Sequence, residues 1–225
     1  MEEDTLAATN LTYDISAIPA PPTSADTICY KNIRLTALRT DPSCFSSTYE
    51  REVAFGEETW GERLSGNGKA VFVARRARLP SYSGDGCEKG EHEEAPFVGT
   101  LSVVAARALP SIAIPDGADR GSSYFIFGMW VAPDHRRRGV GRKLLEAGVK
   151  WAAQDIAEAL GEGREDMYRS QVPAEVFLTV AASNKDAKQM YEKSGFESMS
   201  AELEGGGAAK EEIWLRCRLT VSGCT

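Results

Sequence analysis

A run of six residues combines cations and glycines in a way that suits anion binding, and it reads Arg136-Arg137-Arg138-Gly139-Val140-Gly141. The first amides of a helix lack intrahelical acceptors, and the helix dipole places partial positive charge there. Gly139 and Gly141 would let a bulky ligand come close to the backbone. The run therefore predicts a pyrophosphate site to which Arg142 and Lys143 add charge, and the alternative is a solvated basic helix start.

The elements around this run are those that such a site needs. Residues Tyr124 to Val131 are apolar and aromatic, which predicts a strand, and Gly128 in its interior indicates a bulge. After the run, apolar residues recur at helical spacing, which predicts one long amphipathic helix. These residues are Val140, Leu144, Leu145, Val149, Ala152, Ile156 and Leu160.

A second segment has the same strand-then-helix organisation. Val176 to Ala181 reads as a buried strand, and Asn184 is a suitable N-cap for a helix that ends at Gly195. The strand, the R-x-x-G-x-G run and the segment "ASNKDAKQMYEKSGF" together resemble the GNAT superfamily of acyl-CoA-dependent N-acyltransferases. The resemblance implies an α/β (α+β) domain with a mixed, mostly antiparallel central sheet. Two parallel strands, ending at Val131 and Ala181, would splay apart within that sheet to admit acetyl-CoA.

The resemblance also implies a role for individual residues. The backbone from Arg136 to Gly141 would hold the coenzyme A pyrophosphate, and Met129 and Val131 would bond the pantetheine arm through main-chain groups. Asn184 matches a position that commonly touches the pantetheine region, although it could serve only as a helix cap. Tyr191 matches a tyrosine often proposed to protonate the departing thiolate, and its alternative is a place in the core.

The proton acceptor is not identified by the resemblance. An alkylamine has a pKa near about 10.4 and must lose a proton before it attacks a thioester. Many relatives carry a glutamate on the strand before the phosphate loop, yet residues 124–131 contain no Asp, Glu or His. Glu50, Glu175 and ordered water are the candidates, and a solvated surface carboxylate is the alternative for either glutamate.

These features predict acetyl transfer from acetyl-CoA to a primary amine on a small molecule, by direct attack in a ternary complex. A protein N-terminus or lysine is an alternative acceptor. A non-catalytic acyl-CoA sensor is an alternative of a different class.

Composition limits the other possibilities. The 225 residues fit one domain, 1–225, with a mobile insertion at 81–94 that is either a lid or a surface connection. A net charge of −7 argues against nucleic-acid binding and suits a cationic amine, so the amine side is expected to be acidic. The five cysteines are odd in number and form no CxxC pair, which predicts a reducing, cytoplasmic location. With only two histidines, His92 and His135, no metal site is expected. No membrane association is expected, and the oligomeric state is open, with a homodimer as one option.

The remaining elements are expected in the order that the fold requires. A first strand is predicted within Leu11–Ile18, then a helix capped by Ser24, then one or two short helices within Phe45–Leu64. The last of these segments resembles the substrate-side helices of one group of GNAT enzymes. Further strands are predicted at Ala70–Ala74, Phe97–Ala105, Phe196–Leu203 and Glu211–Leu219, the last two joined by Gly205-Gly206-Gly207.

Overall fold

The computed structural model describes residues 11–77, 95–109, 114–115, 118–161, 174–199, 212–220 and 223–224. Its main sheet has the strand order β1-β2-β3-β4-β5-β7-β6, and β8 pairs with β7. The strands are β1 (Tyr13–Ala17), β2 (Lys69–Arg76), β3 (Phe97–Ala105), β4 (Ser123–Val131), β5 (Glu175–Ala181), β6 (Glu197–Ser198), β7 (Glu212–Thr220) and β8 (Gly223–Cys224). The helices are α1 (Ser24–Thr40), α2 (Tyr49–Val53), α3 (Glu57–Leu64), α4 (Val140–Gly161) and α5 (Lys185–Lys193), with short 3-10 turns at Pro42–Cys44 (η1), Ala106–Ala108 (η2) and Pro133–His135 (η3).

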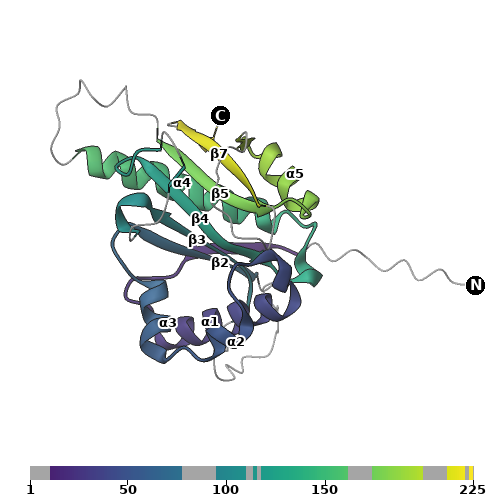
Figure 1. The fold of residues 1–225 in the computed structure, drawn as a ribbon. Coiled ribbons are helices and arrows are strands. Elements are labelled where there is room, and N and C mark those ends of the chain that lie inside the picture. Colours follow the sequence, from purple (N-terminus) through teal and green to yellow (C-terminus); the bar gives the residue numbers. More distant parts are fainter. Residues whose placement is uncertain are drawn as a thin grey trace, which may run out of the picture.

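Helices cover both faces of this sheet, with α1, α2 and α3 grouped together (Figure 1). Alternation along β2 explains the two layers, because successive side chains of a strand point to opposite faces. Phe72 packs into the core cluster that contains α4, whereas Val71 and Val73 pack into the cluster formed with α1 and α3. The predicted face of α4 is confirmed, since its apolar residues from Val140 to Ile156 are buried.

A close approach between α4 and the sheet depends on one glycine. A Cβ built on Gly148 would lie 2.8 Å from the side chains of Leu101 and Val103 on β3. Real Cβ atoms essentially never come so close, so this position of the helix accepts only glycine without a shift. The interior of α4 around Gly148 therefore lies directly against β3.

The parallel strands β4 and β5 separate soon after they meet, as expected. They pair only from Ser123↔Glu175 to Phe125↔Phe177, although β4 continues to Val131 and β5 to Ala181. The predicted bulge is also confirmed, because Gly128 has φ +60° and the β3–β4 register shifts beside it. All other neighbouring strands of the described sheet are antiparallel, so the predicted fold class is confirmed.

Most predicted elements are present, with small differences. The N-cap of α1 is Thr23 and not Ser24, because the Thr23 hydroxyl accepts a hydrogen bond from the Asp26 amide at 3.0 Å. The segment 45–64 forms two helices, α2 and α3, and Gly56 caps the second. The insertion at 81–94 and the glycines at 205–207 lie outside the described residues.

Candidate active site

The turn before α4 has the backbone geometry expected of an anion site. Arg137 has φ +60° and Gly139 has φ +76°. A left-handed residue other than glycine costs roughly 1–2 kcal/mol, and such strain is concentrated at functional sites. The amide of Lys143 donates to the Gly139 carbonyl at 3.0 Å, so the amides before Lys143 are those of the first helical turn. A Cβ on Gly139 would meet nothing within 4 Å, which leaves this side of the turn open to a ligand.

The cations of the turn are mostly engaged by other protein groups. Arg137 pairs with Asp186 at 2.9 Å, Arg142 pairs with Glu146 at 2.7 Å, and Arg138 donates to the Asp134 carbonyl at 3.3 Å. These pairs are exposed, and exposed ion pairs are weak enough for a polyanion to compete. The fixed part of the site is therefore the backbone, and the arginine side chains are adaptable.

Arg136 has a structural task of its own. Its Nε donates to the Val131 carbonyl at 2.8 Å, and its Nη2 donates to Asp41, which also accepts a 2.6 Å hydrogen bond from Trp130. Asp41 is the C-cap of α1. Arg136 thus ties the end of β4 to the end of α1 and fixes the start of the turn.

The structure brings the other predicted coenzyme residues together at the open end of β4. Tyr191 on α5 donates a hydrogen bond to the Met129 sulfur at 3.3 Å. A Cβ on Gly141 would lie 3.2 Å from both Met129 and Met190, so α4, β4 and α5 meet there. Asn184 caps α5 by accepting from the Ala187 amide at 3.2 Å, which confirms the predicted cap.

Tyr191 has the protonation state that its predicted role needs. Its side chain is buried, and burial, followed by the nearby Cys44 thiol, raises the pKa of the phenol above its ordinary value. Such a phenol stays protonated at neutral pH and can donate to a departing thiolate. A thioether is a weak acceptor, so a thiolate would replace the present partner readily.

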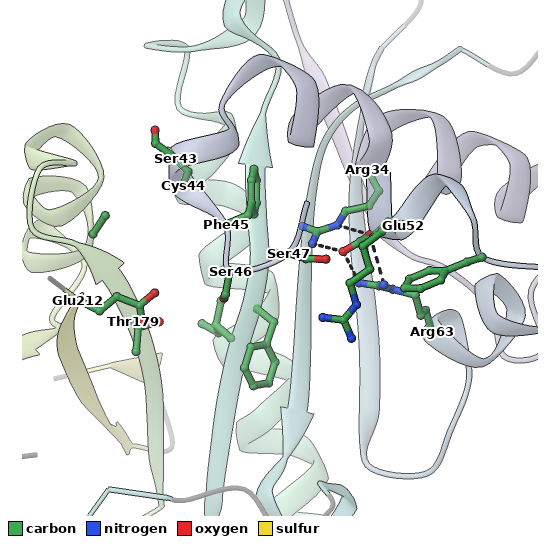
Figure 2. Close-up of a pocket in the computed structure, with 16 residues that line it drawn as sticks. Arg34, Ser43, Cys44, Phe45, Ser46, Ser47, Glu52, Arg63, Thr179 and Glu212 are labelled. Atoms are coloured by element: carbon green, nitrogen blue, oxygen red, sulfur yellow. Dashed lines mark hydrogen bonds and ion pairs between the residues drawn. The ribbon is translucent and has the colours of Figure 1, made fainter. Parts of the chain in front are cut away.

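A pocket of about 340 Å³ lies between the separated strands. It is lined by Arg34, Ser43, Cys44, Phe45, Ser46, Ser47, Arg51, Glu52, Phe55, Arg63, Ile126, Phe127, Gly128, Thr179, Ala181 and Glu212. Figure 2 shows Arg34, Glu52 and Arg63 converging on one side, with Thr179 and Glu212 on the other and the segment Ser43–Ser47 between them. The segment that resembles substrate-side helices therefore supplies much of the pocket wall.

One residue, Cys44, connects the pocket with the residues predicted to bind coenzyme A. Cys44 lines the pocket, and the Asn184 side-chain amide lies 3.6 Å from its sulfur. Cys44 also acts electrostatically on Tyr191. A ligand in the pocket would thus lie beside the position where the coenzyme thioester is expected.

A buried ion pair forms the cationic side of the pocket. Arg34 and Glu52 are both buried and joined by two hydrogen bonds, Nε to Oε2 at 2.9 Å and Nη2 to Oε1 at 2.7 Å. Arg63 approaches the same carboxylate at 3.3 Å. Burial raises the pKa of Glu52, but hydrogen bonds from Arg34 and Ser47 and the charges of Arg34 and Arg63 outweigh it, so this pKa lies below its ordinary value.

The two predicted base candidates do not line this pocket. Glu50 is exposed on α2, two residues before the buried Glu52. Glu175 is buried at the opposite end of β5, with Arg216 at 3.5 Å and Arg218 at 3.7 Å. At about 3.3 Å per residue, it lies about 13 Å along the strand from the pocket residue Thr179. The carboxylates that line the pocket are Glu52 and Glu212, which the sequence interpretation did not select.

The comparisons with known proteins agree with this geometry. Residues 100–198 match the family model described as "Acetyltransferase (GNAT) domain". The match covers less than half of the 225-residue chain and agrees with the predicted resemblance to the GNAT superfamily. The matched domain is an acetyltransferase domain, which agrees with the expected enzyme class and with acetyl-CoA as the expected co-substrate.

Solved structures share the fold at low sequence identity. A putative acetyltransferase from Acinetobacter baylyi has a TM-score of 0.57 at 13% identity, covering 93% of each chain. A spermidine N-acetyltransferase from Vibrio cholerae, in complex with CoA and spermine, has a TM-score of 0.56 at 15% identity and covers 92% of this chain and 95% of its own. Arabidopsis thaliana NAA60 in complex with a bisubstrate analogue has a TM-score of 0.50 at 15% identity, covering 93% of this chain and all of its own. No curated protein sequence matches the chain significantly.

Within the described ranges, no three His, Cys, Asp or Glu side chains gather closely enough to hold a metal ion. Among the helices of the described chain, none is both long and apolar enough to cross a bilayer.

Proposed function

We propose that this enzyme transfers the acetyl group of acetyl-CoA to a primary amine of a small molecule, by direct attack within a ternary complex. The observation that carries the proposal is the pocket of about 340 Å³, because it opens between β4 and β5 and is lined by Cys44. The Cys44 sulfur lies 3.6 Å from the Asn184 side-chain amide and acts electrostatically on Tyr191. The volume of the pocket is at the lower end of the range for small-molecule sites.

The chemistry can be written for groups on both sides of this pocket. The amine loses one proton, its nitrogen forms a bond to the thioester carbon, and the carbon–sulfur bond breaks with its electron pair on sulfur. The nitrogen then loses a second proton. Tyr191 protonates the thiolate and regains one of the two protons that the nitrogen lost, and the other reaches solvent.

The proton acceptor is best sought on the β5–β7 side. Glu52 is a poor base, because its ion pairs lower its pKa and occupy its oxygens. Glu212 lines the pocket and is exposed, and it lies opposite Ala181 in the β5–β7 register. We therefore assign proton acceptance to Glu212 or to water beside it.

The similar solved structures share only the fold with this chain, and this shared fold is the support that they give to amine acetylation. At 15% identity, the spermine bound by the Vibrio cholerae enzyme does not identify the acceptor of this chain. A protein N-terminus or lysine is the second acceptor class, because the pocket opens to solvent beside the exposed Phe127.

Release of free thiol from acetyl-CoA tests the proposal. The full chain should release thiol in proportion to the acetyl-amine formed, when it is assayed with a panel of small primary amines and a panel of peptides. Intact mass spectrometry after incubation with acetyl-CoA alone should show no acetylated protein. Transfer to peptides alone would overturn the small-molecule acceptor, and an acetylated protein that passes its acetyl group to amines would overturn direct attack.

A further inference from the structure

The charge of the pocket differs from the charge of the chain. The protein carries a net charge of −7, yet three arginines line the pocket against two glutamates. An acidic chain would not place guanidinium groups around a cationic substrate without a cost in repulsion. The composition predicts an acidic binding site for the amine, but the arginine-lined part of this pocket is basic.

Glu52 leaves part of this positive charge uncompensated. It is a single carboxylate between Arg34 and Arg63, with which it makes contacts of 2.7 and 3.3 Å. Arg51, the third pocket arginine, is exposed on α2 and has no carboxylate within ion-pairing distance among the residues that the structure describes. The α1–α3 side of the pocket thus has more cationic than anionic groups.

The orientation of Arg34 adds a second donor to this side. Its Nε and Nη2 donate to Glu52, so the guanidinium is locked in place. Its Nη1 lies 3.4 Å from the position of a Cβ built on Gly128, at the bulge in β4. The Phe45 ring stacks on the guanidinium, 4.7 Å from centroid to Cζ, which further fixes it. A planar donor held in this way is suited to a carboxylate or a phosphate.

The opposite side of the pocket carries negative charge. Thr179 and Glu212 come from β5 and β7, across the pocket from the arginines (Figure 2). A ligand with its amine toward β5 and β7 and its anion toward α1 and α2 would match both sides.

We infer that the acceptor is an amine that also carries an anionic group, a carboxylate or a phosphate, bound by Arg51 with the Nη1 group of Arg34. The inference rests on the proposed function and names its substrate class. An amino acid or an amino-sugar phosphate has this chemistry, whereas a polyamine does not.

Matched pairs of amines test the inference on the full chain. Lysine is compared with cadaverine, phenylalanine with phenethylamine, and glucosamine 6-phosphate with glucosamine, and spermine is added as a polycation. We expect kcat/KM to be at least tenfold higher for the anionic member of the preferred pair, since a charge-assisted hydrogen bond is present only there. The carboxylate pairs and the phosphate pair distinguish the two sources of the anion.

Variants locate the preference in the pocket. Arg51→Gln should raise KM for the anionic amine about tenfold and change KM for the member of the pair that lacks the anion much less, and Arg51→Lys should restore part of the preference. Lys150→Gln is the control: it removes one exposed charge on α4, away from the pocket, and should change kcat/KM for neither member of the pair.

The outcomes separate this inference from the proposed function. Equal or faster turnover of cadaverine, phenethylamine, glucosamine or spermine would overturn the inference and leave amine acetylation intact. An equal effect of Arg51→Gln on both members of each pair would also overturn it. If none of the small amines led to thiol release, the proposed function itself would be overturned.

Discussion

The two halves of the proposed active site differ in which parts of the chain they offer for recognition. On the coenzyme side, the turn at residues 136–141 offers backbone amides, and its arginines pair with exposed acids. On the acceptor side, the pocket offers side chains, and its central pair of Arg34 and Glu52 is buried. Backbone amides are present whatever the side chains are, so many proteins can bind the same donor through them. A set of buried side chains, in contrast, can differ from protein to protein to suit each acceptor. The difference teaches that the donor can be identified from a short motif and the acceptor only from the assembled pocket.

The largest effect on stability is expected on the acceptor side, from Glu52→Leu. This change leaves Arg34 buried without its carboxylate, and breaking a buried pair from one side typically costs 3–5 kcal/mol, so we expect a loss of about 4 kcal/mol in the free energy of unfolding. Urea denaturation measures it.

The double variant Arg34→Met/Glu52→Leu is the matched control. It should be more stable than Glu52→Leu alone, because no unpaired buried charge remains near the pocket except the partly exposed Arg63. A double variant that loses the sum of the two single losses would contradict the buried pair as the centre of this wall.

The next largest effect is expected on the coenzyme side, from Gly139→Trp. The indole would cover the amides of the first helical turn, and the loss of two hydrogen bonds to a charged group at 1.5–3 kcal/mol each corresponds to at least about 100-fold in the Kd for acetyl-CoA. Isothermal titration calorimetry measures it. Gly139→Ala has the same backbone strain at φ +76° and an unobstructed Cβ, so it should bind far more tightly than the tryptophan variant.

Tyr191→Phe should have a smaller effect, confined to turnover. The phenol donates only to the weak acceptor Met129 in the resting protein, so its loss should change stability and coenzyme affinity little. Loss of a general acid should lower kcat by about tenfold, less than for a poorer leaving group, since a thiol already has a pKa near about 8.5. Full activity of Tyr191→Phe at every pH tested would show that this tyrosine is not the acid.

The smallest effect is a change in acid sensitivity. The pKa of Glu52 is lower in the folded protein than its ordinary value of 4.5, so its contribution to stability is present above that value and is lost as the pH falls through the folded pKa. Glutamine cannot ionise, so when the pH is lowered from neutral to acid, the free energy of unfolding should fall less for Glu52→Gln than for the wild type. Denaturation at a series of pH values tests this, and parallel curves would contradict it.

The sequence predicts the backbone geometry of the proposed coenzyme side because its signals are local. Gly139 and Asn184 each lie within a few residues of the strand and helix that position them, and both occur where the pattern predicts. The parallel pair and its separation followed from the resemblance, and the bulge at Gly128 from a glycine inside a strand.

The acceptor side could not be found in the same way. Arg34 and Glu52 are 18 residues apart on different helices, and neither residue type indicates burial until both are seen to pair. Glu50 lies two residues from Glu52 and has the same chemistry, so only the packing of α2 against α1 separates an exposed carboxylate from a buried one. The contribution of Glu212 depends on β7 pairing with β5, a long-range contact.

Titration of two variants with acetyl-CoA, side by side, tests the division between the two halves most directly. Arg51→Gln should bind acetyl-CoA with the affinity of the wild type, and Gly139→Trp should bind it at least about 100-fold more weakly while remaining folded. Weak binding by Arg51→Gln, or wild-type binding by Gly139→Trp, would contradict the account.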